Sequence, residues 1–239
     1  MKHILSDGGG VNSTALYFVL RDARLPLDEI VFADTGNEHP ETYSTIKKFK
    51  EIVQEHGVPF ITVKSQLASS LYEYCWQRKT VPYRMRRDCT DKFKLRPIRK
   101  YLRGKYGKAE QFTQYIGIAK EESHRMREAD VKYLHNEFPL IWRGIDRKGC
   151  EEILKENGFA GVVKSGCYFC PFSKKASWLS LIKDHPEMYE RAVQLEENCK
   201  RKNIYLSSLP LRRIREDVLA QKKITDFEMT CDVAGSCFL

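Results

Sequence analysis

One motif near the amino terminus carries most of the structural information, and it reads Ser6-Asp7-Gly8-Gly9-Gly10-Val11-Asn12-Ser13-Thr14. The apolar pair Ile4-Leu5 precedes it, and an apolar helical pattern follows over residues 15–20. This order predicts a strand, a glycine turn and a helix. Glycines let backbone N–H groups approach an anion closely, and a helix start adds unpaired donors and the positive end of the helix dipole. The motif therefore predicts a phosphate cradle. The alternative is a plain tight turn with Ser13 or Asn12 as the helix N-cap.

Two common phosphate loops do not fit this motif. A Walker loop requires a lysine before the serine or threonine, and no lysine precedes Ser13 or Thr14. The dinucleotide fingerprint requires a third glycine where Ser13 stands. The predicted phosphate-binding residues are Gly8, Gly9, Gly10, Val11, Asn12 and Ser13.

The length and composition are those of a folded globular protein. Its 239 residues are enough for one good core, and the apolar share of 42% is ordinary for a globular protein. No apolar run approaches the length of a membrane span, and the amino terminus lacks a signal-peptide pattern. We therefore expect a cytoplasmic protein with no membrane partner.

The positive charge is concentrated in one segment. The chain has a net charge of +9, yet residues 78–105 alone hold twelve lysines and arginines against two aspartates. Such a concentration favours a polyanionic ligand, either nucleotide phosphates or a nucleic acid. Tyr83, Phe93 and Tyr101 are interleaved with the cations and are predicted to stack on exposed bases. A solvated basic helix face is the alternative interpretation.

Strand and helix patterns alternate along the first part of the chain. Short apolar runs at residues 30–33, 59–63 and 111–118 predict further strands, and residues 41–56 form an amphipathic pattern opened by Pro40. This alternation predicts an α/β fold, a doubly wound parallel sheet of Rossmann type with helices on both faces. Ligands of such sheets bind beyond the carboxyl ends of the strands. The glycine motif, Asp34-Thr35-Gly36 and Gly117 all fall at such ends.

The remainder of the chain is predicted to be mostly helical. Asp146 is placed to cap a helix that ends at Asn157-Gly158, and helices are predicted at residues 173–183, 186–202 and 208–223. We therefore expect a nucleotide-binding domain over residues 1–165. Residues 166–239 form a helical extension that we expect to pack on it as one unit.

The glycine motif resembles the PP-loop of the adenine nucleotide alpha-hydrolase superfamily, written S-G-G-x-D-S. Gly8 stands in place of its serine and Asn12 in place of its aspartate. Further collinear stretches resemble the phosphoadenosine phosphosulfate (PAPS) reductase family within that superfamily. They are Phe32–Gly36 with Pro40–Tyr43, Cys89 with Lys94–Ile98, Gly117–Ser123 with Arg125, and Pro139–Trp142.

This resemblance implies roles for the matching residues. The loop Gly8–Ser13 would hold a phosphate or sulfate of an adenine nucleotide, either ATP with Mg²⁺ or PAPS. Asp34, Thr35, Gly36 and Gly117 would line the nucleotide, and Lys94, Arg96 and Arg125 would neutralise further anionic groups. Glu122 has two interpretations, as a catalytic carboxylate or as a helix cap. The catalytic candidates are Asn12, Glu122, Arg125 and Cys237.

A C-x-x-C sequence, Cys167-Tyr168-Phe169-Cys170, indicates a metal centre. A redox disulfide is the alternative, but the thioredoxin-like context of such a pair is absent. A metal centre requires about four ligands, and relatives with an iron–sulfur cluster carry a Cys-Cys pair where this chain has Cys89-Thr90. The predicted set is Cys89, Cys150, Cys167 and Cys170, with a [4Fe–4S] cluster implied by the resemblance and zinc as the alternative. By itself, Cys150 is typical of a small buried apolar residue.

Three functions are compatible with these features. The first is ATP-dependent adenylylation and sulfur transfer onto a nucleic acid bound through residues 78–105, with a sulfur or electron donor protein as partner. The second is reduction of PAPS or adenylyl sulfate to sulfite. Such reductases end in Glu-Cys-Gly-x-His, whereas this chain ends in Ala234-Gly235-Ser236-Cys237-Phe238-Leu239, so Cys237 is either a nucleophile or a partner of Cys231. The third is a catalytically idle nucleotide or nucleic-acid sensor, which Asn12 supports. The oligomeric state is left open.

Overall fold

The computed structural model describes residues 1–201 and 203–220. The chain folds into two compact units. The first comprises residues 1–74 and 88–167, and the second comprises residues 75–87 and the chain from Tyr168 onward. The second unit thus includes a segment, residues 75–87, that lies within the first domain in the sequence-based division. Each unit is described by itself.

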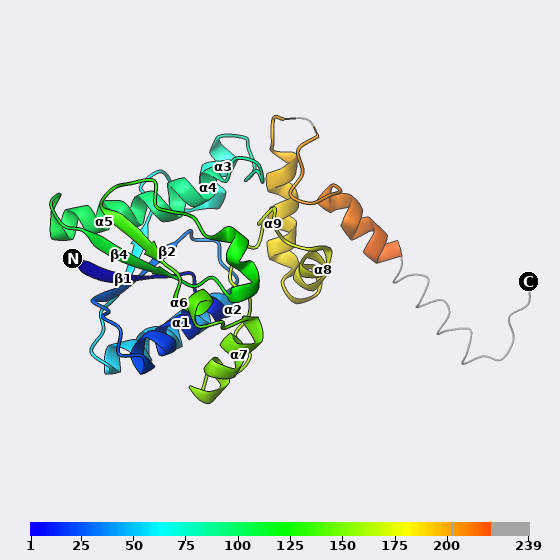
Figure 1. The fold of residues 1–239 in the computed structure, drawn as a ribbon. Helices are drawn as coiled ribbons and strands as arrows, with labels where there is room; N and C mark the ends of the chain where they lie inside the picture. The colour runs from blue at the N-terminus through cyan, green and yellow to red at the C-terminus, as the bar shows by residue number, and fades with distance from the viewer. Residues whose placement is uncertain (202, 221–239) are drawn as a thin grey trace, which may run out of the picture. The chain divides into compact units, whose positions relative to one another are not determined.

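The first unit is built on a five-stranded sheet in which all neighbouring strands are parallel, in the order β3-β2-β1-β4-β5 (Figure 1). The central strand β1 pairs with β2 on one side and β4 on the other, so that Ile4 faces both Glu29 and Gln114. This arrangement confirms the predicted α/β fold. The strands are β1 (Lys2–Asp7), β2 (Glu29–Asp34), β3 (Phe60–Lys64), β4 (Phe112–Ile116) and β5 (Leu134–Glu137).

The edge strand β5 was not predicted. Its sequence is Leu-His-Asn-Glu, and only Leu134 is apolar, so neither an alternating nor a continuous apolar pattern marks it. Its position is set by pairing with β4, where Leu134 faces Phe112. An edge strand with one buried side chain is therefore specified by its neighbour more than by its own composition.

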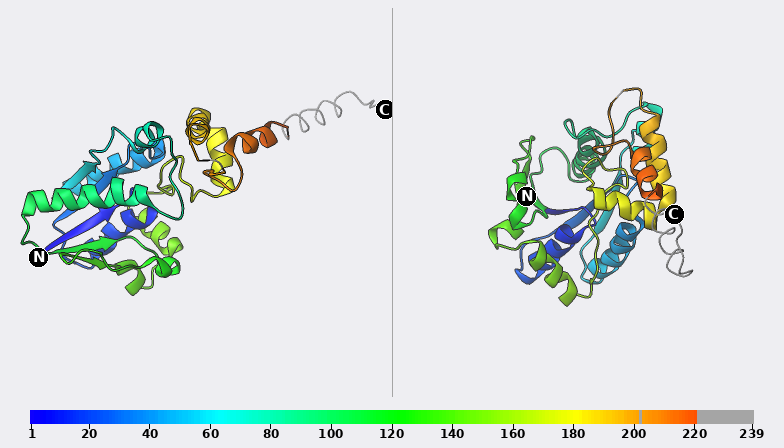
Figure 2. Two further views of the ribbon diagram at one scale, coloured as in Figure 1. Left: turned by 90° about the horizontal axis from the view of Figure 1, so that it is seen from above. Right: turned by 90° about the vertical axis from the view of Figure 1, so that its right-hand side faces the viewer.

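Helices cover both faces of the sheet (Figures 1 and 2). Side chains alternate along β2, where Ile30 and Phe32 belong to one core cluster and Val31 and Ala33 to the other. The first cluster includes side chains of α1 (Val11–Asp22), α2 (Pro40–Glu55) and α7 (Arg147–Glu156). The second includes side chains of α5 (Arg96–Tyr106). Because both faces are covered, β2 is buried along its whole length.

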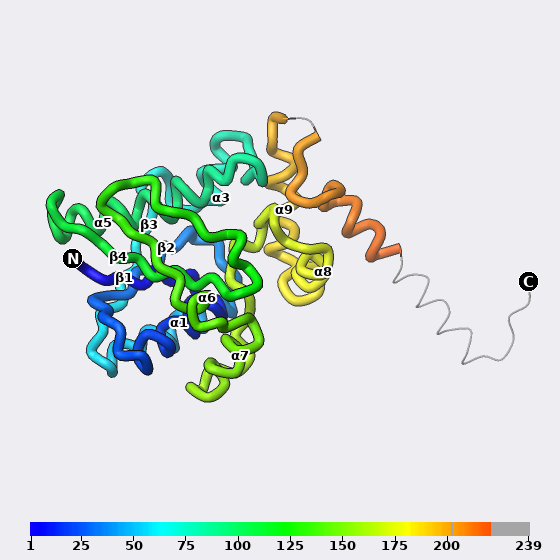
Figure 3. Tube along the Cα trace, viewed as in Figure 1, coloured from blue at the N-terminus to red at the C-terminus, as the bar shows by residue number. Residues whose placement is uncertain are grey.

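The remaining helical segments of the first unit are short, and their path can be followed along the trace in Figure 3. Three of them lie between β3 and α5. No helix within residues 1–201 and 203–220 combines the length and apolar character needed to cross a bilayer. The short helical segments of the first unit are α3 (Leu71–Gln77), α4 (Asp88–Thr90), the π-helix η1 (Asp91–Leu95), the 3-10 helix η2 (Lys120–Arg125) and α6 (Pro139–Trp142). The last residues of α3 belong to the second unit.

The second unit is helical, as predicted. It contains α8 (Lys175–Asp184), α9 (Pro186–Glu197) and a helix over residues 211–220. Trp178 of α8 packs edge-on against Tyr189 of α9, whose hydroxyl donates to the backbone carbonyl of Leu211 at 2.7 Å. The segment 75–87 joins this unit through the end of α9, because the side-chain amide of Asn198 donates to the carbonyl oxygen of Trp76 at 2.8 Å.

Candidate nucleotide site

The glycine motif forms the predicted strand, turn and helix. The strand β1 ends at Asp7 and the helix α1 begins at Val11. The helix N-cap is Gly10, with no side-chain hydrogen bond, so Ser13 and Asn12 do not cap the helix as the alternative interpretation required. The Ser13 side chain turns back towards the strand instead, donating to Asp7 Oδ1 at 2.7 Å and accepting from the Gly8 amide at 3.1 Å.

Close packing on two sides explains why the loop is made of small residues. Gly9 has a φ of +68°, and a Cβ there would lie 2.7 Å from a methyl carbon of Ile46 on α2. On the other side, a Cβ at Gly117 would lie 2.6 Å from the backbone nitrogen of Ser13. The end of β4 is therefore pressed directly against the start of α1.

Asp7 is the main residue of this loop that sequence reasoning missed. Its Oδ1 accepts from the Gly9 amide at 3.0 Å as well as from the Ser13 hydroxyl. The side chain is only 4% exposed, and Oδ2 has no hydrogen-bond partner among the described residues. Burial raises the pKa of Asp7, while the ammonium of Lys94 acts in the opposite direction. The loop donors are therefore arranged around an anion, and that anion belongs to the chain itself.

Two donors at the helix start are left by this arrangement. The first amides of an α-helix have no carbonyl partner within the helix, which applies here to Val11 and Asn12. They supply N–H groups at the positive end of the helix dipole. The predicted phosphate cradle thus reduces to these amides, the glycine turn and the side chains around them.

Three predicted catalytic candidates lie together beside the loop. The Asn12 side-chain amide donates to Glu122 Oε2 at 3.1 Å, and Glu122 Oε1 forms an ion pair with Arg125. Arg147, at the start of α7, donates to Asn12 Oδ1 at 3.3 Å and was not predicted. The cluster places two guanidinium groups and a carboxylate around Asn12. We call these four residues the Asn12 cluster.

The helix-capping role considered for Glu122 belongs to its neighbour. Glu121 accepts from the backbone amide of Arg147 at 3.1 Å, at the first turn of α7. Asp146 accepts from the Gly149 amide at 2.8 Å and is the N-cap of the same helix, as predicted. Glu122 does not cap this helix, and its carboxylate contacts Asn12 and Arg125 instead.

At the end of β2, Asp34 organises a turn. Its Oδ1 accepts from the Gly36 amide and from the Tyr43 hydroxyl, both at 2.8 Å, and its Oδ2 lies 3.0 Å from the ammonium of Lys64. Burial and the hydrogen bond to Asp34 raise the pKa of Tyr43. Gly36 has a φ of +74°, which suits a glycine. The carboxylate therefore holds the loop that the family resemblance assigns to the nucleotide.

A second buried carboxylate, Glu38, lies beyond the same strand. Its Oε1 accepts from the Thr35 hydroxyl at 3.1 Å, and the Cys167 sulfur lies 3.1 Å from that hydroxyl. Glu38 is 2% exposed, and its Oε2 has no hydrogen-bond partner among the described residues. Glu38 and Cys167 also form an isolated antiparallel bridge. No sequence pattern indicates this contact, because the two residues come from distant loops.

The three cations predicted to neutralise nucleotide anions all have carboxylate partners in the chain, and Arg125 pairs with Glu122 as described above. The ammonium of Lys94 lies 3.6 Å from Glu38 Oε1 and also acts on Asp7. Arg96 lies 2.6 Å from Asp91 and is largely exposed. Lys94 therefore belongs to the loop's own charge balance, and a bound anion would compete with two buried carboxylates for it.

One member of the predicted four-cysteine set, Cys150, is a core residue. Cys150 is fully buried in the apolar core between α7 and α1, and burial raises the pKa of its thiol to about 12. Cys89 lies in α4, Cys167 contacts Thr35, and Cys170 belongs to the second unit. Within residues 1–201 and 203–220, no three His, Cys, Asp or Glu side chains are grouped to hold a metal. Cys150 is packed as a core residue and does not fit the predicted ligand role.

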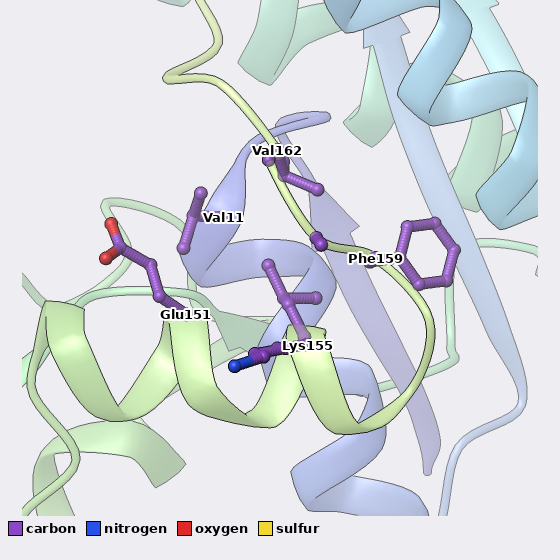
Figure 4. A pocket seen from close by; sticks show the side chains of 8 residues that line it. Val11, Glu151, Lys155, Phe159 and Val162 are labelled. Carbon is purple, nitrogen blue, oxygen red and sulfur yellow. The ribbon is translucent and has the colours of Figure 1, made fainter.

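An apolar pocket of about 350 Å³ opens beside the loop (Figure 4). It is lined by Val11 from α1, Leu154 from α7, and the stretch from Phe159 to Val162. Glu151 and Lys155 stand at its edge as the charged lining residues. The side chain of Val11 therefore contributes to apolar surface, and only its backbone amide belongs to the cradle.

The basic segment 78–105 is divided between the two units. In the first unit Phe93 is 1% exposed, and the Tyr101 hydroxyl donates to Glu29 at 2.9 Å, so neither ring is the exposed stacking surface that we predicted. Several cations of α5 pair with acids, such as Arg99 with Asp130 and Lys105 with Glu29. Cys231 and Cys237 lie outside the described residues.

A comparison with one solved structure supports this architecture. The U34-tRNA thiolase NcsA from Methanococcus maripaludis, solved with its [4Fe-4S] cluster, is 15% identical, with a TM-score of 0.50 over 90% of this chain and 80% of that chain. At this identity the likeness concerns the fold. The PAPS reductase from Candida auris, in a phosphate complex, is 14% identical with a TM-score of 0.49, covering 69% of this chain and 75% of that chain.

Relatives by sequence have no assigned activity. The uncharacterized protein MJ0973 of Methanocaldococcus jannaschii is 26% identical over 70% of this chain and 41% of its own length. The uncharacterized nin region protein ORF290 of Escherichia phage lambda is 26% identical over 56% of this chain and 54% of its own length. The chain thus spans about half, or less than half, of the length of these relatives.

The family assignment comes from a match that covers more than half of the chain. Residues 2–143 match the family described as phosphoadenosine phosphosulfate reductase domain. This range contains the five strands of the sheet, the glycine loop and three of the four residues of the Asn12 cluster. The chain therefore belongs to the PAPS reductase family of the PP-loop superfamily.

Proposed function

We propose that this chain is a nucleotide-dependent enzyme that binds ATP at the glycine loop, adenylylates an oxygen of a nucleic-acid acceptor and directs sulfur into it. The observation that carries the proposal is the arrangement of the loop donors around the buried carboxylate of Asp7. The same turn leaves the first amides of α1 without a carbonyl partner in the helix, and these amides are donors for the oxygens of a phosphate chain.

The charge around the loop favours a nucleotide that carries a cation. Asp7 and Glu38 are both buried carboxylates, and Lys94 stands near both. A free triphosphate would meet this negative charge, whereas Mg²⁺ bound to ATP offsets it. We therefore take the Mg²⁺ complex of ATP as the substrate form.

The Asn12 cluster suits the first step. An acceptor oxygen attacks the α-phosphorus of ATP, the α–β phosphoanhydride bond breaks, and pyrophosphate leaves with the electron pair. Arg125 and Arg147 bring positive charge to the side of the loop where that leaving group gains charge. Asn12, held between Glu122 and Arg147, is a neutral hydrogen-bonding group at this point.

The second step replaces the activated oxygen. A sulfide-level donor attacks the acceptor carbon, the carbon–oxygen bond breaks, and AMP leaves with that oxygen. The sum is acceptor carbonyl, ATP and hydrogen sulfide giving thiocarbonyl, AMP and pyrophosphate, with no net redox change. A sulfur donor protein is the expected source. Because Cys150 is a core residue and does not fit the predicted ligand role, we derive no step of this scheme through an iron–sulfur centre or zinc.

The test is to incubate the full chain with Mg²⁺, ATP, sulfide and unfractionated tRNA or single-stranded DNA. We expect AMP and pyrophosphate in equal amounts, and release that depends on the nucleic acid. Ser13→Ala should lower the rate, because it removes the hydroxyl that orders the loop. Ser180→Ala, on the exposed side of α8, is the matched control.

Two outcomes would contradict the proposal. Sulfite release from PAPS with a thiol donor, and no pyrophosphate from ATP, would indicate the reductase instead. Neither product, together with measurable nucleotide binding, would indicate a nucleotide sensor.

A further inference from the structure

Two stretches that are far apart in the sequence form one exposed surface of the second unit. Residues 83–87 fold into a turn in which the amides of Arg86 and Arg87 both approach the carbonyl oxygen of Tyr83. The guanidinium Nε of Arg84 donates to the carbonyl oxygen of Pro171. This hydrogen bond ties the turn to the chain that follows the C-x-x-C sequence.

An exposed aromatic ring lies at the centre of this surface. Phe172 is 45% exposed, and the guanidinium carbons of Arg87 and Arg84 lie 5.0 Å and 5.9 Å from its ring centroid. These distances are those of cation–π contacts. Met85 is 81% exposed beside them. We call residues 83–87 and 171–175 the Phe172 patch.

The charge of the patch has one sign. Its two stretches read Tyr-Arg-Met-Arg-Arg and Pro-Phe-Ser-Lys-Lys, with five cations and no acid, and all of these cations are exposed. The contacts of Arg84 and Arg87 are to a carbonyl oxygen and an aromatic ring, neither of which neutralises a guanidinium. By contrast, Arg99 and Lys105 of α5 face carboxylates. Arg84 and Arg87 therefore hold positive charge that is available to a polyanion.

The combination of an exposed ring with guanidinium groups matches one class of partner. A base of a single-stranded nucleic acid can stack on an aromatic face, while neighbouring arginines contact its phosphates. A duplex offers phosphates but no unstacked base. The exposed ring of Phe172 can therefore stack on a base of a single strand but has no unstacked base to contact in a duplex.

We infer that the Phe172 patch binds a single-stranded part of the nucleic-acid acceptor, with one base stacked on Phe172 and phosphates held by Arg84 and Arg87. This inference rests on the proposed function, since it names how that acceptor is held. Pro171 joins Phe172 to Cys170, so the stacked base is presented beside the C-x-x-C loop. If the patch holds the acceptor in this way, the modified nucleotide lies in a single-stranded region and not in a double helix.

The experiment measures binding of the full chain to three fluorescent probes by anisotropy. They are a single-stranded RNA, a single-stranded DNA of the same sequence and the corresponding DNA duplex. We expect both single strands to bind more tightly than the duplex, and the ratio of RNA to DNA affinity shows which acceptor is preferred. Phe172→Ala should weaken single-strand binding by about 5- to 100-fold, the range expected for one stacked base. Phe172→Tyr should retain it.

The arginines have a separate signature. Replacing Arg84 and Arg87 by glutamine should lower the slope of log affinity against log salt by about 1.4, since each phosphate contact to a single strand contributes about 0.7. The matched control makes the same charge change at two exposed cations that face carboxylates, with Lys148→Gln on α7 and Arg212→Gln in the helix over residues 211–220. The slope of the control should stay at the wild-type value.

Pyrophosphate release from ATP separates this inference from the proposed function. If ATP is converted and Phe172→Ala binds single strands like the wild type, the patch is not the acceptor site. Equal affinity for duplex and single strand overturns it as well, as does the absence of nucleic-acid binding with ATP turnover intact. If the patch variants lose single-strand binding but no condition yields pyrophosphate, the inference stands and the adenylylation proposal fails.

Discussion

The hydroxyl of Ser13 donates a 2.7 Å hydrogen bond to the carboxylate of Asp7, within the glycine loop that joins β1 to α1. The last residue of the strand thus takes a donor that a bound phosphate would otherwise use. The carboxyl group is buried, and it lies where we propose that a phosphate binds. Asp7 consequently sets how strongly this loop attracts an anion.

We expect Asp7→Asn to tighten the binding of pyrophosphate and ATP. Asparagine retains an oxygen that can accept from Gly9 and Ser13, but it removes a negative charge a few ångströms away, worth on the order of 1–4 kcal/mol. Calorimetric titration should show affinity rising by about tenfold or more. Asp22→Asn, at the far end of α1, makes the same charge change and should have no effect. Unchanged affinity in Asp7→Asn would show that the carboxylate only shapes the loop.

The difference in unfolding free energy between the wild type and Asp7→Asn should depend on pH. Burial raises the pKa of Asp7 above its ordinary value of 3.8, so the folded state holds this proton more tightly than the unfolded chain. The resulting stabilisation is present below that value and is lost as the pH rises through the raised pKa. Urea unfolding should therefore show Asp7→Asn gaining stability relative to wild type between about pH 4 and pH 7. A constant difference across that range would contradict the pKa shift.

Gly117→Ala should damage both the fold and the site. Its new Cβ would lie 2.6 Å from the Ser13 nitrogen, so the start of α1 must move. Overpacking of this kind costs about 1–3 kcal/mol, measured as a drop in the free energy of unfolding, and ATP affinity should fall as well. Gly104→Ala in α5 is the control, because nothing lies within 4 Å of its added Cβ. That variant should be at least as stable as wild type.

Restoring the family's aspartate at residue 12 should be unfavourable in this chain. Asn12→Asp would set two carboxylates side by side, since Glu122 Oε2 lies 3.1 Å from the Asn12 side-chain nitrogen. Like charges this close oppose ionisation, so the variant should be less stable at neutral pH and recover at about pH 5. Adding Glu122→Gln should restore stability at neutral pH. A double-mutant cycle without coupling would show that the two side chains are independent.

The packing of Cys150 can be separated from any role in metal binding. Cys150→Ser places a hydroxyl among apolar side chains and should lower the free energy of unfolding by about 1–3 kcal/mol. Cys150→Ala should cost less. Neither change should alter the iron, sulfide or zinc content of anaerobically prepared protein. Loss of metal in Cys150→Ala alone would return this cysteine to the ligand set.

The strands that the sequence predicted are those whose two faces are both covered. Residues 30–33 form a continuous apolar run because both core clusters use them, and such a run is visible without a structure. The strand β5 has one apolar residue and depends on β4 for its position. The order of the strands follows from long-range pairing, which no local pattern records.

The site was predictable where residues are adjacent in the chain and hidden where they are not. The glycine motif predicted the loop, and the segment around Glu122 predicted that part of the Asn12 cluster. Glu38 meets Cys167 only because two distant loops form a bridge. Spacing suggested Cys150 as a metal ligand, but the face that it takes on α7 depends on packing against α1.

The central position of β1 has a consequence for the order in which the protein is made. Leu5 pairs with Ile30 on one side and with Tyr115 on the other, so one edge of the first strand stays open until β4 has been synthesised. Gly117 reaches the start of α1 only at that moment. A nascent chain that stops before β4 therefore carries the whole glycine motif without a finished nucleotide site, and exposes an unpaired strand edge to other chains. Completion of the sheet and acquisition of nucleotide binding should thus coincide in time during synthesis.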